Sequence, residues 1–143
     1  MASRFIDHEV KSGLKQKRAL SQYIDSVFAA NGISRNSLVY IFCSDEYLLQ
    51  INQQFLNHDT FTDIVTFDQS EDRSKKVTGE IYVSTDRVKE NAGKFNTTYE
   101  RELHRVVFHG CLHLCGFKDK KKEDAALMRQ KEDECLKGYF DTE

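Results

Sequence analysis

The chain contains no proline, so it lacks the proline-rich segments that often join separately folded domains. Its turns must rely on glycine, asparagine and aspartate instead. No apolar run approaches the ~20 residues that a membrane-spanning helix needs. The first residues, Met-Ala-Ser-Arg-Phe-Ile-Asp, also lack the apolar core of a signal peptide. We therefore expect a cytoplasmic protein without a membrane partner.

The chain also lacks a strong excess of charge of either sign. Its 143 residues include 21 basic and 23 acidic side chains, for a formal net charge of −2. Because the whole molecule is not basic, any RNA-binding surface must be a local patch. The length predicts one domain over residues 1–143, large enough to bury a hydrophobic core.

Cysteine is present four times, but no pair has the C-x-x-C spacing of many metal sites. Cys111 and Cys115 lie four residues apart. On a helix they point to roughly the opposite side from His109 and His113, so they cannot share a metal ion with these histidines. We interpret Cys111 and Cys115 as buried free thiols, which stay reduced in the cytoplasm.

Helical and strand patterns alternate along the chain. Apolar spacing and turn signals predict strands over residues 4–9, 38–43, 63–67 and 79–83, and helices over residues 15–30, 45–56, 85–95, 98–115 and 122–137. The last two strands can pair as a hairpin. This order predicts an α+β fold, in which one domain has a small mixed sheet with helices packed on it.

Several local features of these helices can be predicted. Ser44 and Ser84 each cap the helix that follows, and Thr97 forms a capping box with Glu100. Phe55 and Leu56 are expected in the core. The fourth helix should face the core with Leu103, Val107, Gly110 and Leu114, and the last helix with Ala126, Leu127, Met128 and Leu136.

The strongest chemical pattern lies between residues 107 and 119. His109 and His113 are four residues apart, which places both imidazoles on one helix face, one turn apart. Gly116 can end the helix in the left-handed conformation, and Asp119 follows three residues later. Two imidazoles and a carboxylate can hold one Zn²⁺ ion and leave a coordination position for water.

Other interpretations of this segment remain open. Histidines at this spacing also occur in cores and on surfaces without a metal ion. The glutamate of the H-E-x-x-H peptidases is replaced by Gly110, which argues against peptide hydrolysis by that mechanism. Glu102 lies near the histidine face and is either an acid behind the metal or, as we favour, a solvated charge. His104 points away and is expected at the surface.

Lysines flank the predicted third ligand. Lys118, Lys120 and Lys121 surround Asp119 in the sequence. Such a run is usually a solvated helix start, but beside a metal ion it can bind phosphate. These lysines are therefore candidate substrate-binding residues.

Three blocks of the sequence resemble the YbeY family of metal-dependent endoribonucleases, which act in ribosomal RNA maturation. Residues 109–117, His-Gly-Cys-Leu-His-Leu-Cys-Gly-Phe, are similar to the family pattern H-G-x-L-H-L-x-G-[YF]-D-H. Residues 51–67 are similar to L-N…D-x-P-T-D-V-L-S-F, and residues 79–84 to G-D-I-x-I-S. The family's third histidine falls on Asp119, its arginine on Leu56 and its proline on Phe61, so the role of that arginine is not carried over.

The resemblance implies a metal cleft beside the sheet and a single-strand endoribonuclease that acts on small-subunit ribosomal RNA during ribosome assembly. His109, His113 and Asp119 would hold Zn²⁺, or Mn²⁺ or another divalent metal, and the metal-bound water would attack the phosphodiester. No side chain is assigned as general base. Ribosomal proteins or assembly factors are possible further partners.

Two other functions remain open. One is a metal-dependent hydrolase of another substrate. The other is a ribosome-assembly factor that binds RNA or protein without cleaving it, around a structural or vestigial metal site. The departures at Leu56 and Asp119 are the reason to keep the second alternative.

Overall fold

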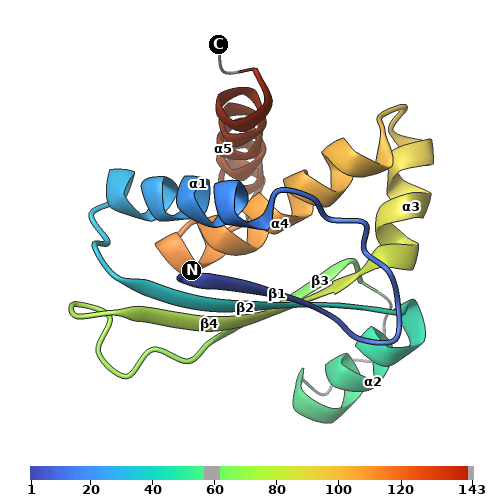
Figure 1. The fold of residues 1–143 in the computed structure, drawn as a ribbon, viewed down its shortest axis with the longest axis horizontal. Helices are drawn as coiled ribbons and strands as arrows, with labels where there is room; N and C mark the ends of the chain where they lie inside the picture. The colour runs from blue at the N-terminus through green and yellow to red at the C-terminus, as the bar shows by residue number, and fades with distance from the viewer. Residues whose placement is uncertain (57–61, 142–143) are drawn as a thin grey trace.

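Strands with alternating buried and exposed side chains form one mixed sheet in this computed structural model, which describes residues 1–56 and 62–141 (Figure 1). The strands of the described residues are β1 (Ser3–Asp7), β2 (Asn36–Cys43), β3 (Ile64–Asp68) and β4 (Val77–Ser84). The helices are α1 (Lys17–Ala30), α2 (Asp45–Leu56), α3 (Thr85–Lys94), α4 (Tyr99–Cys115) and α5 (Lys122–Phe140). The predicted α+β fold class is confirmed.

The sheet has the strand order β1-β2-β4-β3. Strand β2 pairs in parallel with both β1 and β4, and β3 pairs antiparallel with β4, with Ile64 opposite Val83. The predicted hairpin is therefore confirmed. The central pair β2 and β4 joins segments far apart in sequence, whereas the β3–β4 pairing is local.

Helices cover both faces of the sheet (Figure 1). On one face, the inward side chains of β2 and β4 pack with α1, α4 and α5 into the main hydrophobic core. On the other face, α2 packs Leu48 and Ile51 against Cys43 and Val65 in a second, smaller cluster. No helix in the described ranges is long and apolar enough to cross a membrane.

Helix α4 is the most deeply embedded helix. Its predicted inward stripe is confirmed, because Leu103, Val107, Gly110 and Leu114 are all buried. The Tyr40 hydroxyl donates a hydrogen bond of 2.9 Å to the Val107 carbonyl and ties the helix to β2. The predicted N-cap is wrong by one residue. Thr98, not Thr97, accepts the hydrogen bond from the Arg101 amide, because the helix begins at Tyr99.

Ser44 and Ser84 act as predicted, since each side chain accepts a hydrogen bond from the amide three residues later. Other expectations about burial are wrong. Phe55 and Leu56 are exposed, Phe55 by 62%, because the last turn of α2 extends beyond the smaller cluster. Ala126 and Leu127 are exposed because α5 turns a different face inward, with Met128 and Leu136 buried as expected.

Gly110 is a point of close approach between α4 and the sheet. A Cβ atom at this position would lie 3.0 Å from two carbon atoms of Ile81 and 3.1 Å from Cδ1 of Ile64. These distances are shorter than ordinary van der Waals contact, so a side chain would push the helix and the sheet apart. Gly110 therefore allows α4 to lie directly on β3 and β4.

We expect Gly110→Ala to destabilise the protein by about 1–3 kcal/mol through overpacking, despite the better helix propensity of alanine. The matched control is Gly93→Ala in α3, where an added Cβ would meet no atom within 4 Å. There alanine should be neutral or stabilise by up to ~1 kcal/mol. Urea denaturation of both variants measures the difference, and an equal change in stability would contradict the tight contact at Gly110.

Candidate functional site

The two histidines of α4 and the aspartate of the following turn lie together. Nε2 of His109 and Nε2 of His113 are each 3.2 Å from Oδ2 of Asp119. One nitrogen or oxygen atom from each side chain lies within 4.8 Å of the other two, so the group could hold a metal ion. The structure thus brings together the three residues that the sequence proposed as ligands.

The end of α4 explains how Asp119 reaches the histidines. Gly116 adopts the left-handed conformation with φ of 110°, which a residue with a Cβ rarely takes. Its amide donates to the His113 carbonyl, and the Phe117 amide donates to the Leu112 carbonyl, each at 3.0 Å. These bonds close the helix end and turn the chain back. The half-buried Phe117 packs against the main core, and Asp119 returns to the histidine face.

The three side chains lie in a cleft of about 770 Å³. Its walls come from the end of α2, the start of β3, the end of α3, and α4 and α5. Leu56 and Phe95 provide exposed apolar surface, while Asp63 and Arg129 provide charge. Lys120 also lines the cleft, and the other two candidate lysines, Lys118 and Lys121, are exposed close by in sequence.

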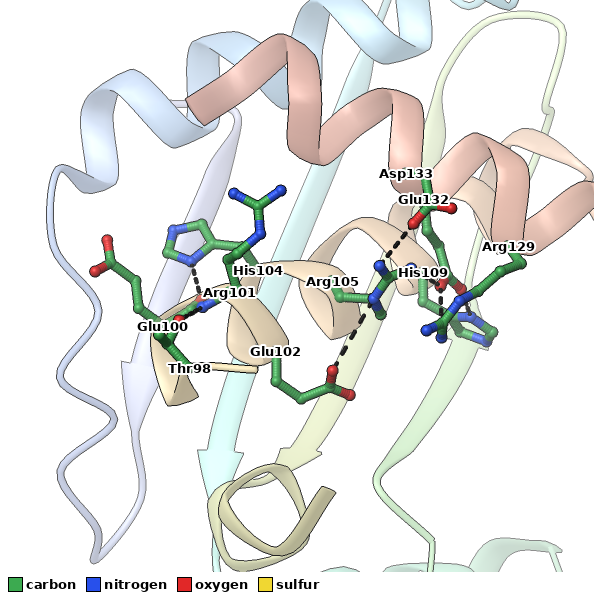
Figure 2. A network of polar contacts seen from close by, with 10 residues as sticks. All are labelled: Thr98, Glu100, Arg101, Glu102, His104, Arg105, His109, Arg129, Glu132 and Asp133. Carbon is green, nitrogen blue, oxygen red and sulfur yellow. Dashed lines mark hydrogen bonds and ion pairs between the residues drawn. The ribbon is translucent and has the colours of Figure 1, made fainter. Parts of the chain in front are cut away.

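The buried side chain of Glu132, on α5, contacts the ring nitrogen of His109 that does not face Asp119. Oε2 of Glu132 lies 2.6 Å from Nδ1 of His109, and Oε1 lies 3.0 Å from Nη1 of Arg105 (Figure 2). Burial of the His109 ring lowers its pKa, but the hydrogen bond and the charge of Glu132 outweigh burial and raise that pKa above its usual value. Sequence analysis missed Glu132, although its position four residues after Met128 and four before Leu136 places an acid on an apolar stripe.

Two expectations about α4 are wrong. Glu102 is not solvated but only 4% exposed, and its carboxylate lies 4.0 Å from Nε of Arg105. His104 is buried, with Nδ1 2.7 Å from the Glu100 carbonyl and its ring against Tyr139 and Phe140. His104 is buried because α5 packs across α4 and covers a second face of that helix (Figure 1). Glu102 points away from α5, on the side of α4 against which α3 packs (Figure 2).

Burial also changes the titration of these groups. It raises the pKa of the Glu102 carboxyl, while the neighbouring Arg105 lowers it. It raises the pKa of Asp63 at the start of the β3 wall, partly offset by His109. It lowers the pKa of His104. Sequence analysis had assigned no role to Asp63, because a single aspartate before a strand is an ordinary feature.

The cysteines are free thiols. The prediction for Cys111 and Cys115 is confirmed in that neither forms a disulfide, although Cys115 is only half-buried. Cys43 and Cys135 are also free, and both are buried.

The fold and the site define a small α+β protein with a His-His-Asp group at the end of its central helix. The family model described as Endoribonuclease YbeY matches residues 5–139, and the chain belongs to this family. Proteins named Endoribonuclease YbeY from Flavobacterium psychrophilum and Cytophaga hutchinsonii are each 46% identical to it, over 131 and 132 residues, covering 92% of both chains in each pair.

More distant relatives agree. The Endoribonuclease YbeY of Parabacteroides distasonis is 40% identical over 136 residues, or 95% of this chain and 94% of its own. The solution structure of a Thermotoga maritima protein, 27% identical, has a TM-score of 0.65 and covers 97% of this chain and 89% of its own. The resemblance proposed from the sequence is therefore confirmed, together with the fold.

We expect His113→Ala to lose stoichiometric zinc binding while far-UV circular dichroism stays near that of the wild type. His113 is partly exposed, and its loss should remove a donor without opening the core. The control is His8→Ala, because the His8 ring packs against Tyr47 and lies outside the group. Unchanged zinc content in His113→Ala would exclude this residue as a ligand.

Proposed function

We propose that the protein is a metal-dependent, single-strand endoribonuclease that acts in the cytoplasm on small-subunit ribosomal RNA during ribosome assembly. The observation that carries this proposal is the convergence of His109, His113 and Asp119 in the cleft. Membership of the Endoribonuclease YbeY family supports the reaction type. The names of the relatives support RNA as the substrate class.

The donor set fits a divalent ion. Two imidazole nitrogens and one carboxylate oxygen suit Zn²⁺, and the carboxylate makes Mn²⁺ a stronger competitor than a third histidine would. The carboxylate also offsets about one unit of the ion's charge. When bound, the ion would act as a Lewis acid and lower the pKa of a water molecule toward ~7. His109, His113 and Asp119 would hold and orient it.

Cations beside this group suit a phosphate backbone. Arg129 lines the cleft, and its side chain is 55% exposed. Lys120 lines the cleft on the turn that carries Asp119, between the exposed Lys118 and Lys121. Contacts from such side chains to phosphate oxygens position a nucleic acid without selecting its sequence. This local patch is compatible with the formal net charge of −2.

Exposed apolar side chains on the same walls suit unpaired bases. Phe95 at the end of α3 is 51% exposed and lines the cleft, as does Leu56. Single-stranded RNA presents base faces that can stack on an aromatic ring, whereas a duplex hides them. Phe95 therefore supports a single-stranded substrate. Leu56 supplies apolar surface at the position where the family resemblance would place an arginine.

The test is a cleavage assay with single-stranded RNA, the matching duplex and casein, each with and without a chelator. We expect cleavage of the single strand alone, its loss with the chelator and its recovery after Zn²⁺ or Mn²⁺ is added. Cleavage of casein would favour a hydrolase of another substrate, and RNA binding without cleavage would favour an assembly factor.

Phe95→Ala should raise KM for single-stranded RNA by roughly 5- to 150-fold, since stacking of a base on an aromatic ring contributes about 1–3 kcal/mol. Zinc content should not change, because Phe95 lies outside the His-His-Asp group. The control is Leu127→Ala, which removes an exposed apolar side chain on α5. Equal KM values for Phe95→Ala and the wild type would rule out base stacking at this position.

A further inference from the structure

We infer that Glu132 is a positioning residue for His109 and that Arg105 holds Glu132 in place. The inference rests on the proposed metal site, and it assigns a role to helix α5, which contributes none of the three proposed ligands. In this arrangement, Glu132 fixes the ring of His109 so that Nε2 faces His113 and Asp119.

The two ring nitrogens of His109 have different partners. Nδ1 lies 2.6 Å from Oε2 of Glu132, whereas Nε2 lies 3.2 Å from Oδ2 of Asp119. The Nδ1 contact has hydrogen-bond geometry, whereas the Nε2 contact is at ion-pair distance only. An ionised carboxylate can only accept hydrogen bonds, so the hydrogen belongs on Nδ1 of His109 when Nε2 binds an ion. Nε2 then keeps its lone pair for an ion. A carboxylate that accepts a hydrogen bond from the other ring nitrogen of a metal-binding histidine also makes the imidazole more basic. The imidazole then binds the metal ion more strongly.

Arg105 explains why Glu132 can remain in this position. Glu132 is 5% exposed, and a buried carboxylate without a partner is strongly destabilising. Nη1 of Arg105 lies 3.0 Å from Oε1 of Glu132, which leaves Oε2 for His109 (Figure 2). Arg105 is held in turn by Asp133 at 2.6 Å and by Glu102 at 4.0 Å. These three acidic side chains contact different nitrogens of Arg105 and so fix the orientation of its guanidinium.

A purely structural role would be to tie α5 to α4, and Asp133 provides the comparison. Asp133 binds the same guanidinium from the same helix, but its side chain is mostly exposed and it lies outside the His-His-Asp group. Glu132 contacts both Arg105 and His109, and its Oε1 also lies 4.0 Å from Nη1 of Arg129. Substitution of Glu132, or of Arg105 acting through Glu132, should therefore weaken metal binding by the His-His-Asp group, whereas substitution of Asp133 should not.

The experiment measures zinc affinity by competition with a chromophoric chelator, so it does not depend on RNA cleavage. Glu132→Gln should bind Zn²⁺ about 10- to 100-fold more weakly than the wild type. Asp133→Asn should bind it as tightly as the wild type. Arg105→Met should also weaken binding, but it should cause no further loss in the Glu132→Gln background, because both residues act through one contact.

A measurement on the wild-type protein supplements the variants. Nitrogen NMR of the zinc-loaded chain should show His109 bound through Nε2, with the hydrogen on Nδ1. Binding through Nδ1 would overturn the inference, as would wild-type zinc affinity in Glu132→Gln or additive losses in the double variant. If the wild-type chain binds no zinc, the proposed metal site fails, and the inference fails with it.

Discussion

The contact of Gly110 with Ile81 and Ile64 determines where the candidate site lies. Because Gly110 has no side chain, α4 can approach β3 and β4 closely at this point. The neighbouring His109 then emerges beside the start of β3, and His113 follows one turn later. The cleft forms where the histidine face of α4 meets the ends of α2 and α3. Close packing in the core therefore sets the geometry of a polar site.

Burial on two sides makes α4 unusual among the helices of the described residues. One face packs on the sheet, and another is covered by α5. Arg105 and Glu132 meet between these two helices, and Glu102 lies beside Arg105 on α4 but points away from α5 (Figure 2). Isolated charges at such buried positions would be costly. The three charges offset one another, and Arg105 contacts both acids. The wall behind His109 is therefore charged but largely closed to water, which strengthens its hydrogen bonds.

Features that depend on neighbouring residues could be predicted from the sequence. The helix stop at Gly116 and the proximity of His109, His113 and Asp119 arise within one short segment, and the β3–β4 hairpin is local. The burial of Glu102, His104 and Glu132 could not be predicted, because it depends on where α3 and α5 dock on α4. The exposure of Phe55 was missed for a similar reason. Periodicity shows which face of α2 is apolar, but not how far the opposing cluster extends.

The donors of the candidate site all lie between residues 109 and 119, whereas Glu132 approaches from another helix. Three donors this close in sequence remain near one another even when the chain is unfolded. A metal ion with some affinity for the unfolded chain stabilises the native state by less than its binding free energy. Only the contact from Glu132 requires α5 to be docked. Metal removal should therefore lower the free energy of unfolding by less than the free energy of zinc binding to the native state. The difference between these two free energies measures the affinity for zinc that the unfolded chain retains.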